Sequence, residues 1–105
     1  MANATAELTV EQLLRKADKR LSSPNAWCKG DFLARNRCCL VGALQYAATG
    51  NASIQTLKTR NAESLLRELT GMASAIHFND DNKTTFKDVK ALVKKAIKVA
   101  KERGI

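Results

Sequence analysis

Apolar residues recur at helical spacing along most of this chain. Over residues 10–21 they fall on one face of a helix. Thr9 and Gln12, three residues apart, match the pattern of a capping box at the start of that helix. Pro24 follows, and because proline cannot donate a backbone hydrogen bond, it favours an end to the helix before it. Over residues 38–49 nearly every side chain is apolar or small, a pattern typical of a helix buried on all sides. These patterns predict a first amphipathic helix and a second, central one.

The second half of the chain is also helical in pattern. A third helix is expected over residues 54–70, with Asn61 as a candidate break within it. A short helical turn over residues 73–78 then leads into a polar loop at residues 79–82. Thr85 is placed to cap the last helix, whose apolar residues gather on one side. No strand pattern exceeds four or five residues, so we predict an all-α fold: one compact domain of four or five helices around the central helix.

The remaining segments define the domain organisation. Residues 1–7 are expected to be a flexible N-terminus, followed by a single helical domain over residues 8–105. Residues 25–37 form a long loop in this interpretation, and its two aromatic side chains are expected to pack back onto the core. The first ten residues lack the basic and apolar regions of a signal peptide. No apolar run approaches the roughly 18 residues of a membrane span.

The three cysteines and the single histidine are the candidates for chemistry. An odd number of cysteines fits free thiols in a reducing cytoplasm better than a disulfide framework. The spacing of Cys28, Cys38, Cys39 and His77 lacks the paired ligands of a zinc site, so no metal or cofactor is expected. A cysteine hydrolase or transferase is the alternative, with Cys39 or Cys28 as the nucleophile, His77 as the base and Asn79 as the group that orients it.

Positive charge is concentrated at the C-terminal end of the chain. The whole chain has 18 Lys and Arg against ten Asp and Glu, a formal net charge of +8. Residues 83–105 contain eight basic and two acidic residues. At about 100° per residue, five lysines gather on the side of the last helix opposite its apolar residues. This lysine row comprises Lys87, Lys90, Lys94, Lys98 and Lys101.

Two interpretations of the lysine row are open. It is either a solvated face whose lysine stems cover the edge of the core, or a docking surface for an acidic partner. Because aromatic residues are few and none lies in the row, stacking on single-stranded nucleic acid is poorly supported. Val and Ala opposite the lysines disfavour a helix that lies on a membrane. We therefore expect an acidic protein surface or a nucleic acid as the partner, and no membrane.

Two segments resemble the pattern of a known family. Residues 39–44 have the form C-L-x-G-A-L, and the Phe78-Asn79-Asp80 run, followed by Thr and a V…L-V…A stretch, has the form of an aromatic-N-D ending. From about Leu8 to Ala100 the chain resembles a family of small helical bacterial and phage proteins of unknown function. The resemblance implies a compact helical domain and brings no activity, cofactor or partner. Its motif residues in this chain are Trp27, Gly30, Cys39, Gly42, Asn79 and Asp80.

The shared residues also have a physical interpretation. We expect Trp27 to pack on the Gly42 face of the central helix. Asp80 is expected to accept hydrogen bonds at the start of the last helix, or to pair with Arg35 or Arg37 across the domain.

These observations predict a binding protein rather than an enzyme. We expect a small, basic, cytoplasmic binding or regulatory module, of phage or mobile-element type, that docks an acidic partner through the lysine row of its last helix. The alternatives are the cysteine hydrolase or transferase described above and a protein that binds nucleic acid non-specifically. The sequence leaves the oligomeric state open.

Overall fold

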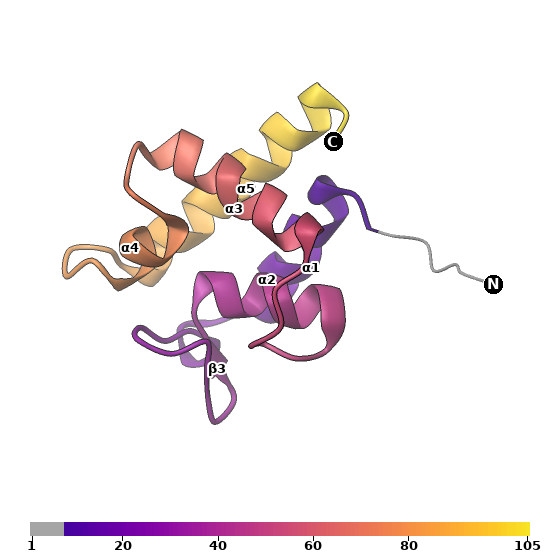
Figure 1. Ribbon diagram of the computed structural model, residues 1–105. Coiled ribbons are helices and arrows are strands. Elements are labelled where there is room, and N and C mark those ends of the chain that lie inside the picture. The colour runs from indigo at the N-terminus through magenta and orange to yellow at the C-terminus, as the bar shows by residue number, and fades with distance from the viewer. Residues whose placement is uncertain (1–7) are drawn as a thin grey trace.

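Five α-helices and one short hairpin make up residues 8–105, which are the residues that the computed structural model describes (Figure 1). The all-α prediction is confirmed. The expected flexible N-terminus, residues 1–7, lies outside the described residues. In chain order the elements are α1 (Val10–Arg20), the 3-10 helix η1 (Pro24–Ala26), β2 (Leu33–Ala34), β3 (Arg37–Cys38), α2 (Leu40–Thr49), α3 (Leu57–Thr70), α4 (Ala75–Asp80) and α5 (Phe86–Arg103).

The predicted helix starts are confirmed at both ends of the domain. Thr9 accepts a hydrogen bond from the Gln12 N–H, and the Gln12 side chain accepts one from the Thr9 N–H, which completes the capping box of α1. Thr85 and Asp88 form the same reciprocal pair at the start of α5. Each box satisfies two backbone donors that a helix would otherwise leave without partners.

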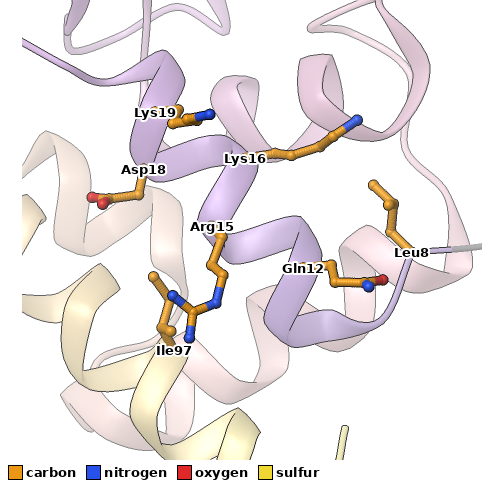
Figure 2. A pocket seen from close by; sticks show the side chains of 7 residues that line it. All are labelled: Leu8, Gln12, Arg15, Lys16, Asp18, Lys19 and Ile97. Atoms are coloured by element: carbon orange, nitrogen blue, oxygen red, sulfur yellow. The ribbon is translucent and has the colours of Figure 1, made fainter.

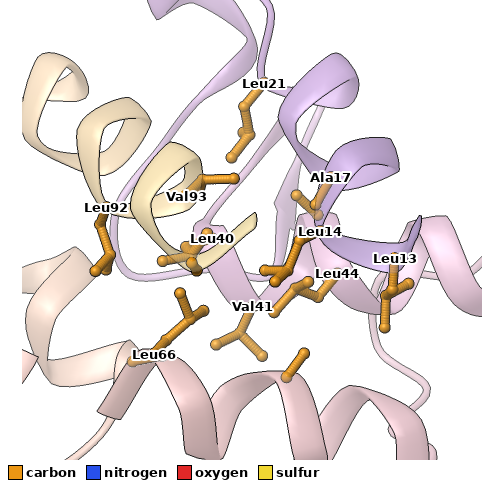
Figure 3. Close-up of a cluster of buried hydrophobic side chains, with 14 of the residues drawn as sticks. Leu13, Leu14, Ala17, Leu21, Leu40, Val41, Leu44, Leu66, Leu92 and Val93 are labelled. Atoms are coloured by element: carbon orange, nitrogen blue, oxygen red, sulfur yellow. The ribbon is translucent and has the colours of Figure 1, made fainter. Parts of the chain in front are cut away.

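The expected central helix is α2. Residues 40–45 are all buried, and α2 packs against α1, α3 and α4. Helix α5 packs against α1 and α3. Figure 3 shows apolar side chains from α1, α2, α3 and α5 meeting in one cluster. Residues 8–105 therefore share one core, and α1 and α5 lie side by side along one flank of it.

Several predicted boundaries are wrong. The central helix begins at Leu40 rather than at residue 38, because Cys39 caps it. The third helix begins at Leu57 rather than at residue 54, because Thr56 caps it, and Asn61 is exposed within the helix and does not break it. Helix α4 extends through Asp80, so Asn79 and Asp80 belong to a helix and not to a loop. Residues 25–37 are not a plain loop, since they contain the end of η1 and most of a two-stranded antiparallel hairpin.

None of the helices over residues 8–105 combines the length and the apolar character that crossing a lipid bilayer requires.

Candidate functional site

Four members of the lysine row are exposed along α5: Lys87, Lys94, Lys98 and Lys101. Their spacing of three, four or seven residues keeps them on one side of the helix. Among residues 8–105 these four ammonium groups form no ion pair; the three ion pairs found there are Arg15–Glu11, Lys90–Asp18 and Arg103–Glu68. The charge of these four exposed lysines is thus directed to solvent.

Lys90 corrects the prediction of a five-lysine docking surface. Its Nζ lies 2.6 Å from Asp18 Oδ1 and donates to the carbonyl oxygens of Asp18 and Leu21, each at 2.9 Å. Only 21% of the Lys90 side chain is exposed. Because these carbonyls belong to the last turn of α1, where the helix dipole is negative, the ammonium group stabilises that end. Lys90 therefore joins α5 to α1 and is not available to a partner.

Helix α1 adds basic side chains that the sequence interpretation missed. A hollow of about 520 Å³ lies beside α1 and is lined by Leu8, Gln12, Arg15, Lys16, Asp18, Lys19 and Ile97. Figure 2 shows Arg15 reaching from α1 toward Ile97 on α5. Ile97 is the one residue of α5 in that lining, and Lys94 and Lys101 lie three residues before it and four residues after it on the same side of the helix. The polar face of α1, with basic residues at positions 15, 16 and 19, was the signal in the sequence that could have revealed this extension.

The motif residues at the other end of the domain form a hydrogen-bonded cluster around Asn79. Its side chain is 0% exposed. Asn79 Oδ1 accepts from Trp27 Nε1 at 2.6 Å and from the Leu40 N–H at 3.0 Å. Asn79 Nδ2 donates to the Cys28 carbonyl at 3.1 Å and to Asp80 Oδ1 at 2.9 Å. One amide thus links α4 to the segment around Trp27 and to the start of α2.

Two expectations about this cluster are wrong. Asp80 contacts neither the start of α5 nor an arginine; its Oδ1 accepts from the Gly30 N–H at 3.0 Å and from Asn79 Nδ2. The backbone of Phe32, not Trp27, lies against Gly42. Trp27 instead packs beside Phe86, with ring centroids 6.1 Å apart. The hairpin approaches α2 so closely that its backbone takes the space the indole was expected to fill.

The cysteines and His77 are not arranged as a nucleophile and its base. Cys39 is the N-cap of α2, is 4% exposed, and its Sγ accepts from the Gly42 N–H at 3.2 Å. A hollow of about 250 Å³ beside it is lined by Gly30, Asp31, Phe32, Cys39, Ile76 and Asp80, so His77 is not part of it. His77 Nδ1 instead lies 3.0 Å from Ser74 Oγ, at the cap of its own helix. Over residues 8–105, no group of three His, Cys, Asp or Glu side chains is placed to hold a metal ion.

Burial raises the pKa of all three thiols. It raises the pKa of Cys39 to about 11, although hydrogen bonds from the Gly42 and Val41 backbone lower it in part. Burial also raises the pKa of Cys28 and of Cys38, with a smaller contribution in Cys28 from the neighbouring Cys38. Because the thiolate is the reactive form, all three groups are held in their unreactive form at neutral pH.

We therefore expect slow alkylation of every cysteine in the folded protein at neutral pH. The rate should rise with pH and continue to rise above about 8.5, the ordinary pKa of a free thiol. Mass spectrometry after iodoacetamide treatment measures the labelling of each site, and the same protein in denaturant provides the fast reference. One cysteine that labels as quickly in the folded protein as in denaturant would contradict this prediction and favour the cysteine-enzyme alternative.

Comparison with other proteins places the chain in a family without adding an activity. No curated protein and no solved structure matches it. A family model described as "Family of unknown function (DUF6197)" matches residues 5–99. That match covers both the α1–α5 flank and the Asn79 cluster, and we conclude that this protein belongs to that family of unknown function.

Proposed function

We propose that the protein is a small basic binding or regulatory module that docks an acidic partner through the exposed lysines of α5. The observation that carries the proposal is the presentation of Lys87, Lys94, Lys98 and Lys101 on one side of a single rigid helix, without ion pairs among residues 8–105. Like charges at this spacing repel one another at a small cost each, so the arrangement does not help the fold. An acidic partner would relieve that repulsion.

Electrostatic steering is the physical benefit of such a surface. A row of one sign of charge raises the local concentration of oppositely charged partners and accelerates their association. Lys90 supports the proposal indirectly, because its contacts with Asp18 and Leu21 hold α5 firmly against α1. The remaining lysines are thus presented on a fixed element rather than on a loose C-terminal segment.

The proposal also places the module in a reducing cytoplasm. Support for this comes from the three cysteines, which are all free thiols and whose odd number does not suit a disulfide framework.

The test is charge reversal at the centre of the surface. We expect Lys94→Glu/Lys98→Glu to weaken binding of an acidic probe at low salt by about tenfold or more, because each change removes an attraction and adds a repulsion. The measurement is fluorescence anisotropy with two labelled probes, a random-sequence DNA duplex and a poly-glutamate peptide.

A matched control lies on α3. Arg60→Glu/Arg67→Glu changes the net charge by the same amount at two exposed positions of α3 that do not belong to the lysine row, and we expect it to retain most of the binding. Circular dichroism checks that both variants stay folded. The proposal fails if the wild-type protein binds neither probe, or if the two double variants lose binding equally, which would indicate a response to net charge alone.

A further inference from the structure

The outer face of α1 lies between two hollows that share their basic residues. The first is the hollow beside α1 and Ile97 described above. The second, also about 520 Å³, lies between α1 and the end of α2 and is lined by Lys16, Lys19, Arg20, Tyr46, Ala47 and Gly50. Lys16 and Lys19 line both hollows. We call Lys16 and Lys19 the basic ridge of α1.

Carboxylates near the ridge are already neutralised. Asp18, the one acidic residue that lines the first hollow, pairs with Lys90, and Glu11 pairs with Arg15 at 2.8 Å. No acidic residue lines the second hollow among the residues that the structure describes. The ridge therefore adds positive charge on α1, between Ile97 of α5 and the end of α2, to the charge of the exposed lysines of α5.

The far edge of this surface is formed by Arg20 and Tyr46. Tyr46 is 43% exposed, and the Arg20 guanidinium carbon lies 5.4 Å from the centre of its ring, within the range of a cation–π contact. Arg20 also donates to the Asn36 carbonyl at 2.7 Å. These two contacts hold a further positive charge in place beside the second hollow.

We infer that the acidic partner is a nucleic acid duplex, whose phosphate backbone lies across the basic ridge of α1 and the exposed lysines of α5. The inference rests on the proposed function and names its partner. Phosphates are bound by cations without any requirement for an apolar contact area. The surface from α5 to Tyr46 supplies lysines and arginines from two packed helices, which is the arrangement that such binding needs.

A protein partner fits this surface less well. The centre of a protein–protein interface is depleted in lysine and enriched in aromatic and other large apolar side chains. The large apolar side chains that are exposed in the described residues lie mostly elsewhere, on the hairpin, around α3 and on α4. Tyr46 lies on this surface, and Ile105, whose carbonyl accepts from the Glu11 N–H, lies beside the start of α1. Lysine dominates the surface instead, so it lacks the anchors on which protein interfaces depend.

A surface that contacts only the phosphate backbone of a nucleic acid is expected to bind a duplex without sequence preference. Lysine is a flexible point charge and does not supply the planar fork with which arginine recognises guanine. Binding to single strands depends on stacking of bases on aromatic rings, and the Arg20 guanidinium lies over the ring of Tyr46. The duplex is therefore the form of nucleic acid that we expect to bind best.

Salt dependence of binding tests this inference. Each phosphate contact contributes about 0.9 to the slope of log K against log salt concentration. We expect Lys16→Gln/Lys19→Gln to lower the magnitude of that slope by up to about 2 for a random-sequence duplex, and Arg60→Gln/Arg67→Gln on α3 to leave it unchanged. Anisotropy titrations at several salt concentrations give the slopes for the wild-type protein and both variants.

The outcomes separate this inference from the proposed function. If the wild-type protein binds poly-glutamate but not the duplex, and Lys94→Glu/Lys98→Glu abolishes that binding, the inference fails while the proposed function stands. An unchanged slope in Lys16→Gln/Lys19→Gln, or a single strand that binds more tightly than the duplex, also overturns the inference. If neither probe binds at low salt, both fail.

Discussion

Replacing Gly42 by alanine is expected to lower the free energy of unfolding by about 3 kcal/mol or more, at the upper end of the cost of overpacking a core. A Cβ at this position would lie 2.0 Å from the carbonyl oxygen of Phe32, 2.7 Å from its carbonyl carbon and 2.9 Å from its Cα. All three are backbone atoms, so no side-chain rotation relieves the clash. The hairpin must move away from α2, and that movement disturbs the buried residues at the start of the central helix.

The sign of the change in stability distinguishes the clash with the Phe32 backbone from the effect of helix propensity. In the interior of an ordinary helix, alanine is more favourable than glycine by about 1 kcal/mol, so propensity alone predicts that the substitution stabilises α2. Urea denaturation gives the two free energies, and Ala91→Gly, at an exposed position inside α5, is the control for the propensity term. A Gly42→Ala variant as stable as the wild-type protein would show that Phe32 does not approach α2 this closely.

The elements that were predicted well are those determined by neighbouring residues. Thr9 and Thr85 begin their helices because each finds its partner three residues along the chain, and the apolar face of α5 follows from its own spacing. A glycine just after a helix is a local signal of the same kind, and Gly50 ends α2 in the left-handed conformation that favours glycine. Such signals lie within one or two turns of the chain and need no knowledge of the tertiary structure.

The features that were missed depend on residues far apart in the sequence. Lys90 resembles the other lysines of its row, and only the packing of α5 against α1 brings it to Asp18, 72 residues earlier in the chain. The hairpin has strands of two residues each, too short for any alternating pattern to be recognised. The contacts of the motif residues around Asn79 depend on a close approach of α4 to the Trp27 segment, which no local rule specifies.

The candidate binding surface depends both on local signals and on contacts between residues far apart in the sequence. Four of the five predicted lysines are exposed as expected, because helix periodicity alone puts them opposite the core. The contribution of Lys16 and Lys19 required the structure, since it arises from hollows on either side of α1. The size and direction of the candidate binding surface were therefore not predictable from the last helix by itself.

Replacing Asn79 by alanine is expected to lower the free energy of unfolding by about 3 kcal/mol or more. The truncation leaves the Trp27 Nε1–H, the Leu40 N–H and the Cys28 carbonyl without the partner they have in the folded protein. Each buried polar group that loses its partner costs about 1–3 kcal/mol, and the space left by the side chain adds a cavity term. The lost Leu40 contact matters further because it lies in the first turn of α2, where backbone donors depend on such partners.

Two comparisons identify the source of that loss. Asp80→Ala removes a carboxylate that accepts from Gly30 and Asn79 but is exposed, so its cost should be about 1 kcal/mol. Asn82→Ala, at an exposed position two residues further on, should stay within about 0.5 kcal/mol of the wild-type protein. Urea denaturation followed by fluorescence gives all three values, and the single tryptophan of the chain reports on the cluster directly. An Asn79→Ala variant no less stable than Asp80→Ala would mean that the amide does not hold α4, the Trp27 segment and α2 together.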